Sequence, residues 1–268
     1  MNGCTQGYKI TRRRQAIALR WRIVLPAVLL LCLLGVDPPT FASHWRTVAP
    51  GVEYTDLGAT LLSPWSHIHA FRIDLKTNKL DLVMAKALSQ GRASADEFAQ
   101  YSKALITLNG GFFDHNYHAL GLRIGNQQQY SPLKRISWWS IFYIKDQTPA
   151  ISSVRTYNPN QPVEFAVQSG PRLLIKGRIP SLKIGRAERS ALGITHQGQV
   201  IIVVTENTPI TTTELAHLMQ SSPLHCKSAL NLDGGSSSQL HAHMNAFQVN
   251  AHGFSSVSDA IIVKPRSE

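Results

Sequence analysis

The sequence predicts a strand-rich α+β or mixed α/β domain, in which a mixed twisted sheet carries a few packing helices and an N-terminal signal segment precedes the fold. Three observations support this prediction. Apolar stretches of strand length outnumber those with helical spacing. Only two capping boxes mark helix starts, at Ser94–Glu97 and Thr211–Glu214. A basic stretch followed by an apolar run opens the chain.

The first 42 residues are typical of a secretory signal. The apolar run 23–36 follows a cluster of Lys and Arg residues, and Thr40-Phe41-Ala42 offers small residues at the −3 and −1 positions of a cleavage site. The run is short for a membrane span, which needs about 20 apolar residues, so a cleaved signal peptide is favoured over an uncleaved anchor. We therefore expect an exported domain at 43–268, periplasmic or secreted, with membrane contact through the N-terminal segment alone.

Composition limits the classes of partner. Cys226 is the single cysteine after residue 42, so packing rather than a disulfide must hold the domain. The formal net charge is +11, part of it carried by the leader. The remaining mild excess suits a small anionic substrate, and the absence of a Lys/Arg run or a ladder of stacking aromatics argues against nucleic acid. The sequence requires no cofactor and leaves a divalent cation and the oligomeric state open.

The first half of the domain alternates strands with one helix. Four stretches combine β-branched, aromatic and apolar residues and predict strands: 52–57, 67–74, 80–84 and 104–108. The capping box at Ser94 starts a helix that runs through Tyr101. His67 and His69 share one strand face, for which solvent exposure is a simpler explanation than a metal pair without a third ligand.

The second half repeats that order. Further strands are predicted at 120–124, 137–144, 163–168, 173–175, 200–204 and 260–263. The stretch 200–204 is continuously apolar, as in a strand buried on both faces. Thr211 starts a helix whose buried stripe is Leu215, Leu218 and Met219, and a strand ending at Asp233 follows.

Two glycine pairs follow these helix–strand units. Residues 231–237 read Asn-Leu-Asp-Gly-Gly-Ser-Ser, and residues 109–111 read Asn-Gly-Gly. An Asp-Gly pair between apolar residues is also a strong hairpin signal. The second copy favours a site instead, because open sheets bind ligands at the carboxyl ends of strands and glycines allow close approach.

Three more stretches place charge at strand boundaries. They are Ser169-Gly170-Pro171-Arg172, Arg186 to Gly193, and Thr205-Glu206-Asn207. The planar fork of arginine matches phosphate oxygens, so Arg172 and Arg189 suit an anionic phosphodiester. The alternative is that each arginine pairs with a surface acid.

Taken in order, these motifs resemble the phosphodiester glycosidase family. The resemblance rests on 109–114, 169–172, 189–194, 214–216 and 231–237, and it spans about 55–263. It implies a domain that hydrolyses the bond between a sugar's anomeric carbon and a phosphodiester oxygen. Relatives often carry Asp-Gly where this chain has Thr205-Glu206-Asn207, and many keep a glycine at the position of Ser236.

The resemblance also implies roles for individual residues. Asp233 is the first choice for nucleophile or base, with Asp114 as its partner and Glu206 as a third catalytic candidate. Arg172 and Arg189 are expected to hold the phosphate. The remaining substrate-binding candidates are Asn109, Gly110, Gly111, Phe112, Ser169, Gly170, Ser190, Gly234, Gly235, Ser236 and Ser237.

Three other functions compete with this one. A serine hydrolase is disfavoured because Ser238 occupies the final glycine position of the nucleophile elbow. A metal site at His241, His243 and His252 is a weaker alternative, since alternating histidines are commonly just exposed. The alternative from another class is a non-catalytic envelope protein that binds an anionic polysaccharide and assists its biosynthesis or export.

Overall fold

The computed structural model describes residues 45–58 and 63–266, which lie within one compact unit, 43–268. The predicted signal segment 1–42 falls outside the described residues. They form two α-helices and seventeen strands. The predicted dominance of strands is therefore confirmed.

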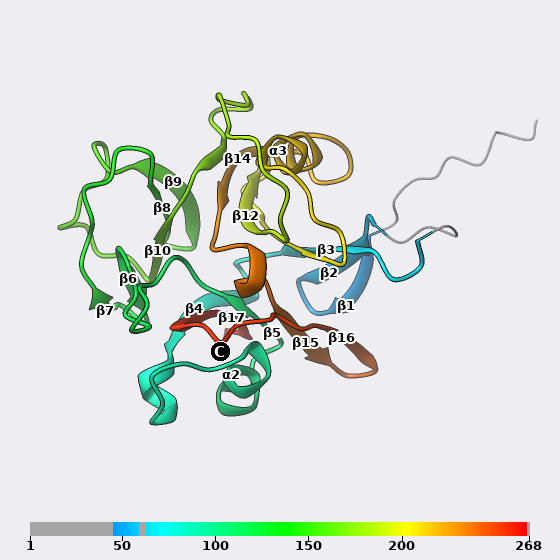
Figure 1. Ribbon diagram of the computed structural model, residues 1–268, viewed down its shortest axis with the longest axis horizontal. Coiled ribbons are helices and arrows are strands. Elements are labelled where there is room, and N and C mark those ends of the chain that lie inside the picture. Colours follow the sequence, from blue (N-terminus) through cyan, green and yellow to red (C-terminus); the bar gives the residue numbers. More distant parts are fainter. Residues whose placement is uncertain (1–44, 59–62, 267–268) are drawn as a thin grey trace, which may run out of the picture. The chain divides into compact units, whose positions relative to one another are not determined.

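Three antiparallel sheets build the domain (Figure 1). The seven-stranded sheet has the order β1 (Arg46–Ala49), β2 (Val52–Asp56), β3 (His67–Ile73), β13 (Val200–Glu206), β12 (Ser190–Thr195), β14 (Cys226–Asn231), β11 (Arg172–Leu174). The second has the order β7 (Gln128–Ser131), β6 (Arg123–Gly125), β10 (Phe165–Ser169), β8 (Ser140–Lys145), β9 (Thr148–Ser153). The third has the order β16 (Phe247–Ala251), β15 (Leu240–Met244), β5 (Ile106–Asn109), β17 (Asp259–Pro265), β4 (Asn78–Met84).

The prediction of a mixed sheet is wrong for the described chain, where every strand pair is antiparallel. Parallel neighbours need a crossover, usually a helix, that returns the chain to the same end of the same sheet. The two helix–strand units do not do this. The strand after the first helix joins the third sheet, and the strand after the second joins the seven-stranded sheet.

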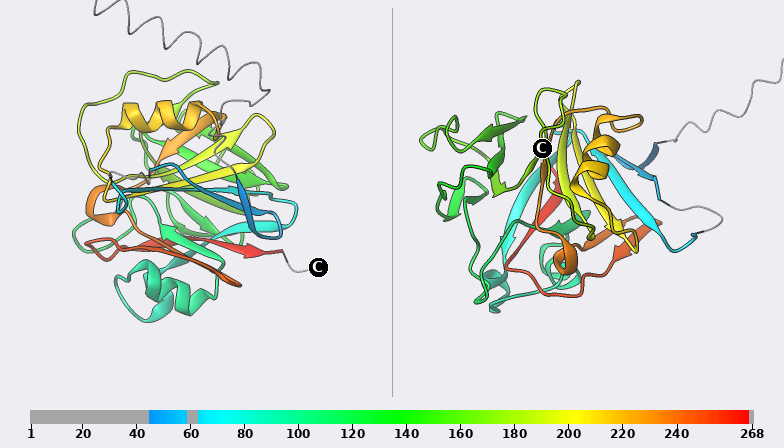
Figure 2. Two further views of the ribbon diagram at one scale, coloured as in Figure 1. Left: turned by 90° about the vertical axis from the view of Figure 1, so that its right-hand side faces the viewer. Right: turned by 45° about the horizontal axis from the view of Figure 1, so that its top comes forward.

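Both predicted helices form, and each covers one sheet. Ser94 and Thr211 cap α2 (Ala95–Ser102) and α3 (Thr212–Gln220) with complete capping boxes. Leu215 and Met219 of α3 pack on Val203 of β13, while Phe98 of α2 packs against the third sheet. Figure 2 shows α3 and α2 on opposite sides of the packed sheets. Two short 3₁₀ turns, η1 (Ala85–Leu88) and η2 (Gly235–Ser237), complete the fold.

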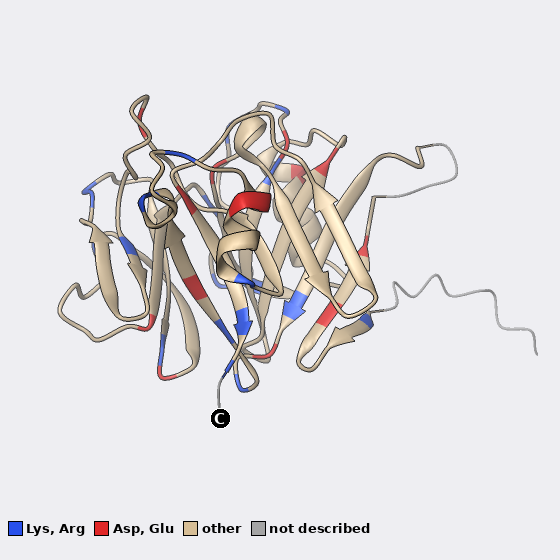
Figure 3. Cartoon of the chain, turned by 90° about the horizontal axis from the view of Figure 1, so that it is seen from below, with Lys and Arg blue, Asp and Glu red and all other residues tan. Residues whose placement is uncertain are grey.

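The main core lies where the three sheets face one another. Phe71 of β3, Leu108 of β5 and Phe142 of β8 are fully buried in it. Strand β13 is buried on both faces, as predicted, because alternate residues face this core and α3. Figure 3 shows acidic and basic residues interspersed along the chain on the side that it presents.

A buried ion pair ties the second sheet to the third. Arg123 of β6 donates from Nε to Oδ1 of Asp259 in β17 at 2.9 Å, and both side chains are fully buried. The guanidinium also donates to the carbonyl oxygens of Gln168 and Phe112, each at 3.0 Å. Ser258 donates its hydroxyl to the other oxygen of Asp259 at 2.6 Å. The desolvated charges are therefore compensated by several fixed hydrogen bonds.

We expect Asp259→Asn to lower the free energy of unfolding by about 3–5 kcal/mol, because it leaves the Arg123 charge buried and unpaired. The matched control is Glu53→Gln at the partly exposed Arg72–Glu53 pair, which should cost about 1 kcal/mol or less. Urea unfolding of the two variants measures both values. Equal small losses would show that the buried pair does not hold the sheets.

Candidate active site

The Asp-Gly-Gly element forms a turn between two sheets. It follows β14, and η2 then leads into β15 of the third sheet. Gly235 adopts φ +64°, a conformation that favours glycine. The Gly234 amide donates to Oδ1 of Asp233 at 3.1 Å, which fixes the carboxylate beside the turn. The hairpin alternative is wrong, because β14 and β15 do not pair with each other.

The two predicted Asn/Asp-Gly-Gly elements meet, as their similar settings suggested. Nδ2 of Asn109 donates to the carbonyl oxygen of Asp233 at 2.8 Å, and the amide of Asp233 donates to the carbonyl oxygen of Gly110 at 3.3 Å. Oδ1 of Asn109 accepts from the Ser190 hydroxyl at 2.7 Å and from the Gln239 amide at 3.2 Å. Asn109 and Ser190 are both buried. Asn109 thereby positions Asp233, with Ser190 behind it, and the predicted substrate contacts of these two buried residues stay predictions.

Gly110 and Gly111 also serve a different purpose from the one predicted. A Cβ atom on Gly110 would lie 1.8 Å from Oδ1 of Asp259, and one on Gly111 would lie 2.7 Å from Nη2 of Arg123. These distances are far below van der Waals contact. The glycines make room for the buried ion pair, and their role in substrate binding stays a prediction.

A cavity of about 690 Å³ opens beside Asp233. The predicted site residues that line it are Phe112, Gly170, Arg189, Asp233, Gly234 and Gly235. Its other lining residues include Trp138, Lys183 and Asn231. Asp233 is the single carboxylate among the residues that line this cavity. Its volume is in the range of small-ligand sites.

Burial raises the pKa of the Asp233 carboxyl, against the effect of hydrogen bonds from the Ser237 hydroxyl and the Gly234 amide. The negative charge of Asp259 raises this pKa further, and the positive charge of Arg123 lowers it. Desolvation disfavours the charged form of a carboxyl. Asp233 is therefore less acidic than an ordinary aspartate, a property often found at catalytic sites.

Arg189 presents a fixed positive charge to the same cavity. Its Nε donates to the carbonyl oxygen of Ile210 at 2.9 Å, and Nη2 donates to that of Gly185. Its Nη1 lies toward Gly234, where an added Cβ would be 3.7 Å away. Burial lowers the pKa of Arg189 from its usual high value, and an arginine remains protonated at neutral pH. The guanidinium thus has a nitrogen available for an anion.

The remaining serine and arginine candidates lie near the cavity without lining it. Arg172 begins β11 opposite Leu230 and is half-buried, and its Nε has no hydrogen-bond partner. Ser169 ends β10 fully buried, also with an unpartnered hydroxyl. Ser237 is buried against Asp233, whereas Ser236 is exposed. The phosphate role of Arg172 stays a prediction.

Asp114 does not join Asp233 in the cavity. Its Oδ1 accepts the amides of Asn116 and His118, each at 2.9 Å, in a loop at the surface. The His118 amide is the main reason that the pKa of Asp114 is lowered. This carboxylate orders its own loop, and its role as a partner of Asp233 stays a prediction.

Glu206 also lies outside the cavity. Its Oε2 is 3.1 Å from Nε2 of His69, whose Nδ1 is 3.0 Å from the Tyr54 hydroxyl. His69 is 4% exposed, so the expectation of a solvated face is wrong for this residue. Burial lowers the pKa of His69, against the effect of the Glu206 hydrogen bond.

No group of three or more His, Cys, Asp or Glu residues in the described part of the chain could hold a metal ion. The alternative metal site therefore does not assemble there. His241 and His252 both lie against Asp96, at 2.8 and 3.5 Å, without His243.

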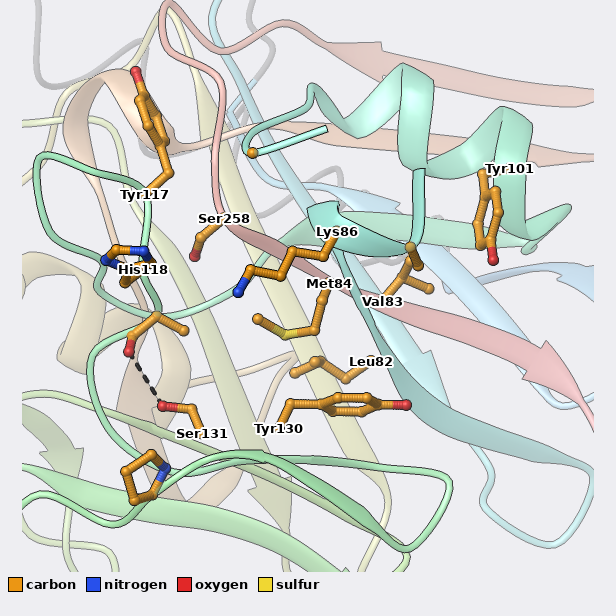
Figure 4. Close-up of a pocket in the computed structure, with 14 residues that line it drawn as sticks. Leu82, Val83, Met84, Lys86, Tyr101, Tyr117, His118, Tyr130, Ser131 and Ser258 are labelled. Carbon is orange, nitrogen blue, oxygen red and sulfur yellow. Dashed lines mark hydrogen bonds between the residues drawn. The ribbon is translucent and has the colours of Figure 1, made fainter. Parts of the chain in front are cut away.

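A second cavity, of about 650 Å³, is lined in part by Tyr117 and His118 of the loop that follows Asp114 (Figure 4). Tyr101, Tyr117 and Tyr130 surround it, and Lys86 extends into it. None of its lining residues is a carboxylate. It therefore lacks the group that glycoside hydrolysis uses, and the cavity beside Asp233 is the better candidate active site.

Sequence reasoning missed four contributors to this site. Arg123 and Asp259 carry no local motif, since their partners are distant in sequence. Trp138 was assigned to a strand, but it lies before β8 and is 55% exposed. Lys183 lies in a loop that no motif marks. The position of Lys183 between two glycine- or proline-containing stretches is the one sequence feature that could have indicated its place at the site.

Comparison with known proteins identifies the family. The sequence profile of the phosphodiester glycosidase family matches residues 102–264, which is more than half of the chain. The chain belongs to the phosphodiester glycosidase family. It is thereby a member of a family of glycosidase-type hydrolases.

Individual relatives are more distant. The uncharacterized protein YigE of Escherichia coli is 24% identical over 163 residues, which cover 54% of this chain and 64% of YigE. The catalytic domain of zebrafish N-acetylglucosamine-1-phosphodiester α-N-acetylglucosaminidase is 17% identical with a TM-score of 0.61, covering 84% of this chain and 87% of that domain. A hypothetical protein from Synechocystis is 16% identical with a TM-score of 0.60, covering 87% of this chain and 65% of that chain. These structures share the fold.

No helix in the part of the chain that the structure describes has the length and apolar character to cross a membrane.

We expect Asn109→Ala to lower the free energy of unfolding by about 1–3 kcal/mol, because it leaves the Ser190 hydroxyl and the Gln239 amide without their buried acceptor. Ser236→Ala, at an exposed position nearby, should change stability by about 0.5 kcal/mol or less. Thermal and urea unfolding compare the two variants. An unchanged stability of Asn109→Ala would contradict the positioning role.

Proposed function

We propose that this protein hydrolyses the C1–O bond of a sugar 1-phosphodiester and releases the sugar and a phosphomonoester. The observation that carries this proposal is the pairing, in one cavity, of a carboxyl with a raised pKa and a guanidinium that has no carboxylate partner among the described residues. The first suits a sugar carbon that develops positive charge, and the second suits the departing phosphate. Family membership supports the same reaction class.

Different residues of the cavity would contact different parts of the substrate. The anomeric carbon would lie against Asp233, and the phosphate against Arg189 and Lys183. Phe112 and Trp138, whose ring centroids are 6.0 Å apart, offer aromatic surface to the rest of the molecule. Binding both ends of the scissile bond on fixed groups lowers the entropic part of the barrier.

The reaction follows from these positions. Cleavage of C1–O leaves its electron pair on the phosphate oxygen, whose charge the cations stabilise without a strong general acid. Asp233 either attacks C1 or activates the water that does so. The water oxygen ends on C1, and its proton is released. In both routes Asp233 must be ionised, so the rate falls as the pH drops through its raised pKa.

Export of the enzyme to the periplasm or beyond is part of the same proposal, and it rests on the predicted signal segment. The competing function, binding of an anionic polysaccharide without turnover, requires no carboxylate next to the anion. The presence of Asp233 beside Arg189 therefore favours catalysis.

We expect Asp233→Asn to lower kcat for a sugar 1-phosphodiester by about 10³-fold or more, as for other residues that act directly on the reacting centre. Because the pKa of this carboxyl is higher in the folded state than in the unfolded state, its protonated form favours the folded state at low pH. This contribution to stability is lost as the pH rises through the folded-state pKa. Asp233→Asn should thus be at least as stable as the wild type at pH 7. Substrate hydrolysis and thermal unfolding measure the two effects. Tight glycan binding by the wild type, without turnover of any phosphodiester tested, would favour the binding function.

We expect Arg189→Ala to lower kcat/KM by about 10²–10³-fold, because one charge-stabilising donor is lost from the site. Arg189→Lys should recover only part of this loss, since an ammonium lacks the planar fork. Arg155→Ala is the matched control, because Arg155 is exposed and lies outside the lining of the cavity. Steady-state kinetics should leave that control within about threefold of the wild type. An equal loss in both alanine variants would argue against phosphate binding by Arg189.

A further inference from the structure

The mouth of the candidate active site exposes large apolar side chains. Ile184 is 98% exposed and Trp138 is 55% exposed, and both line the cavity that contains Asp233. Lys183, which is exposed, lies directly beside Ile184. Single exposed apolar residues are ordinary on a protein surface. Here two of them line one cavity together with the cation Lys183, which is a pattern that chance exposure does not explain.

The segments that carry these residues contain only one sign of charge. Neither 131–140 nor 171–187 contains an Asp or Glu residue. Their exposed cations are Lys134, Arg135, Lys176, Arg178, Lys183 and Arg186. Arg186 is the one that forms an ion pair within the described chain. Of these two segments, Trp138 and residues 181–185 line the cavity, and we call Trp138 and residues 181–186 its basic rim.

The basic rim has the chemistry of a surface that meets an anionic lipid bilayer. Lys and Arg are attracted to the negative surface potential of such a bilayer, and apolar tips such as Ile and Trp enter its interfacial layer. Trp in particular has an apolar ring and a polar N–H that suit the headgroup region. A basic surface would attract soluble anions and anionic bilayers alike. The exposed Ile184 side chain gains nothing from a soluble anion, whereas it can enter the interfacial layer of a bilayer.

The lining of the cavity combines polar and apolar surface. Asp233, Asn231 and Arg189 contribute polar groups, and Phe112, Leu182 and Ile184 contribute apolar surface. A phosphodiester bound with its sugar against Asp233 would therefore find apolar surface for its other substituent in the same cavity.

We propose that the basic rim docks on an anionic membrane surface and that the substrate is a sugar 1-phosphate esterified to a lipid alcohol. This inference rests on the proposed function of the site. Water adds at C1, the C1–O bond breaks, and the products are the free sugar and a lipid phosphate that stays in the bilayer. Membrane contact then involves the folded domain as well as the N-terminal segment.

The kinetic test uses the full chain and two probes that share one sugar. These are the 1-phosphodiesters of N-acetylglucosamine with a polyprenol, in vesicles of phosphatidylglycerol and phosphatidylcholine, and with methanol, in solution. We expect kcat/KM to be at least about tenfold higher for the polyprenyl substrate. Ile184→Asp should reduce that preference by about tenfold or more.

The matched control is Trp65→Ala. Trp65 is 76% exposed but does not line the cavity, so the preference should stay within about twofold of the wild type. Residues 1–42 are common to all variants, so any membrane affinity of that segment cancels in the comparison. Equal kcat/KM for the two substrates, or an unchanged preference in Ile184→Asp, would overturn the assignment of a lipid substrate.

A binding test separates docking from turnover. Asp233→Asn should sediment with the phosphatidylglycerol vesicles as the wild type does, and more weakly at high salt, whereas Ile184→Asp should lose at least about fivefold in binding. Equal binding by Ile184→Asp would overturn the docking surface. Turnover of neither phosphodiester, with Ile184-dependent sedimentation retained, would overturn the proposed hydrolysis and the lipid substrate while leaving the docking surface in place.

Discussion

The buried ion pair between Arg123 and Asp259 is the constraint on which the site depends. It joins β6 to β17, and it fixes the chain at Phe112 through a hydrogen bond to the carbonyl oxygen. Its bulk explains why Gly110 and Gly111 cannot carry side chains. Because Gly110 also accepts the amide of Asp233, the pair indirectly sets the position of the proposed catalytic carboxylate. Two desolvated charges are tolerated here because hydrogen bonds surround both of them.

The antiparallel order of the seven-stranded sheet determines which strand ends meet. Strand β12 begins beside the ends of its neighbours β13 and β14, so Ser190, Thr205 and Asn231 lie at the same end of the strands. The third sheet brings Asn109 to this end, and its side chain links Ser190, Gln239 and Asp233. Most polar side chains there form hydrogen bonds with one another. Among the residues of the predicted motifs, Asp233 and Arg189 are the charged groups that line the cavity. A rigid polar frame around a few available groups is what preorganised catalysis requires.

The same arrangement separates positioning from recognition. The motif residues on strands and tight turns hold the carboxylate and the guanidinium. The loops before β8 and after β11 supply Trp138, Lys183 and Ile184 at the entrance. The chain shares its fold with solved structures at 16–17% identity. Because loops tolerate change more readily than paired strands do, under the proposed function the loops at the entrance would set which substrate is accepted.

The sequence by itself determined the local features and the family. Capping boxes and apolar periodicity depend on neighbours within a few residues, so the helix starts at Ser94 and Thr211 and the buried strand β13 could be predicted. The similar sequences of the 109 and 233 elements, rather than their spacing, predicted that both belong to one site. The tertiary structure alone decided the three antiparallel sheets, the buried role of Asn109, the separation of Asp114 and Glu206 from the cavity, and the basic rim beside it. Arg123 and Asp259 are 136 positions apart. No local spacing records such a contact, because it exists only once two sheets with independent registers pack against each other.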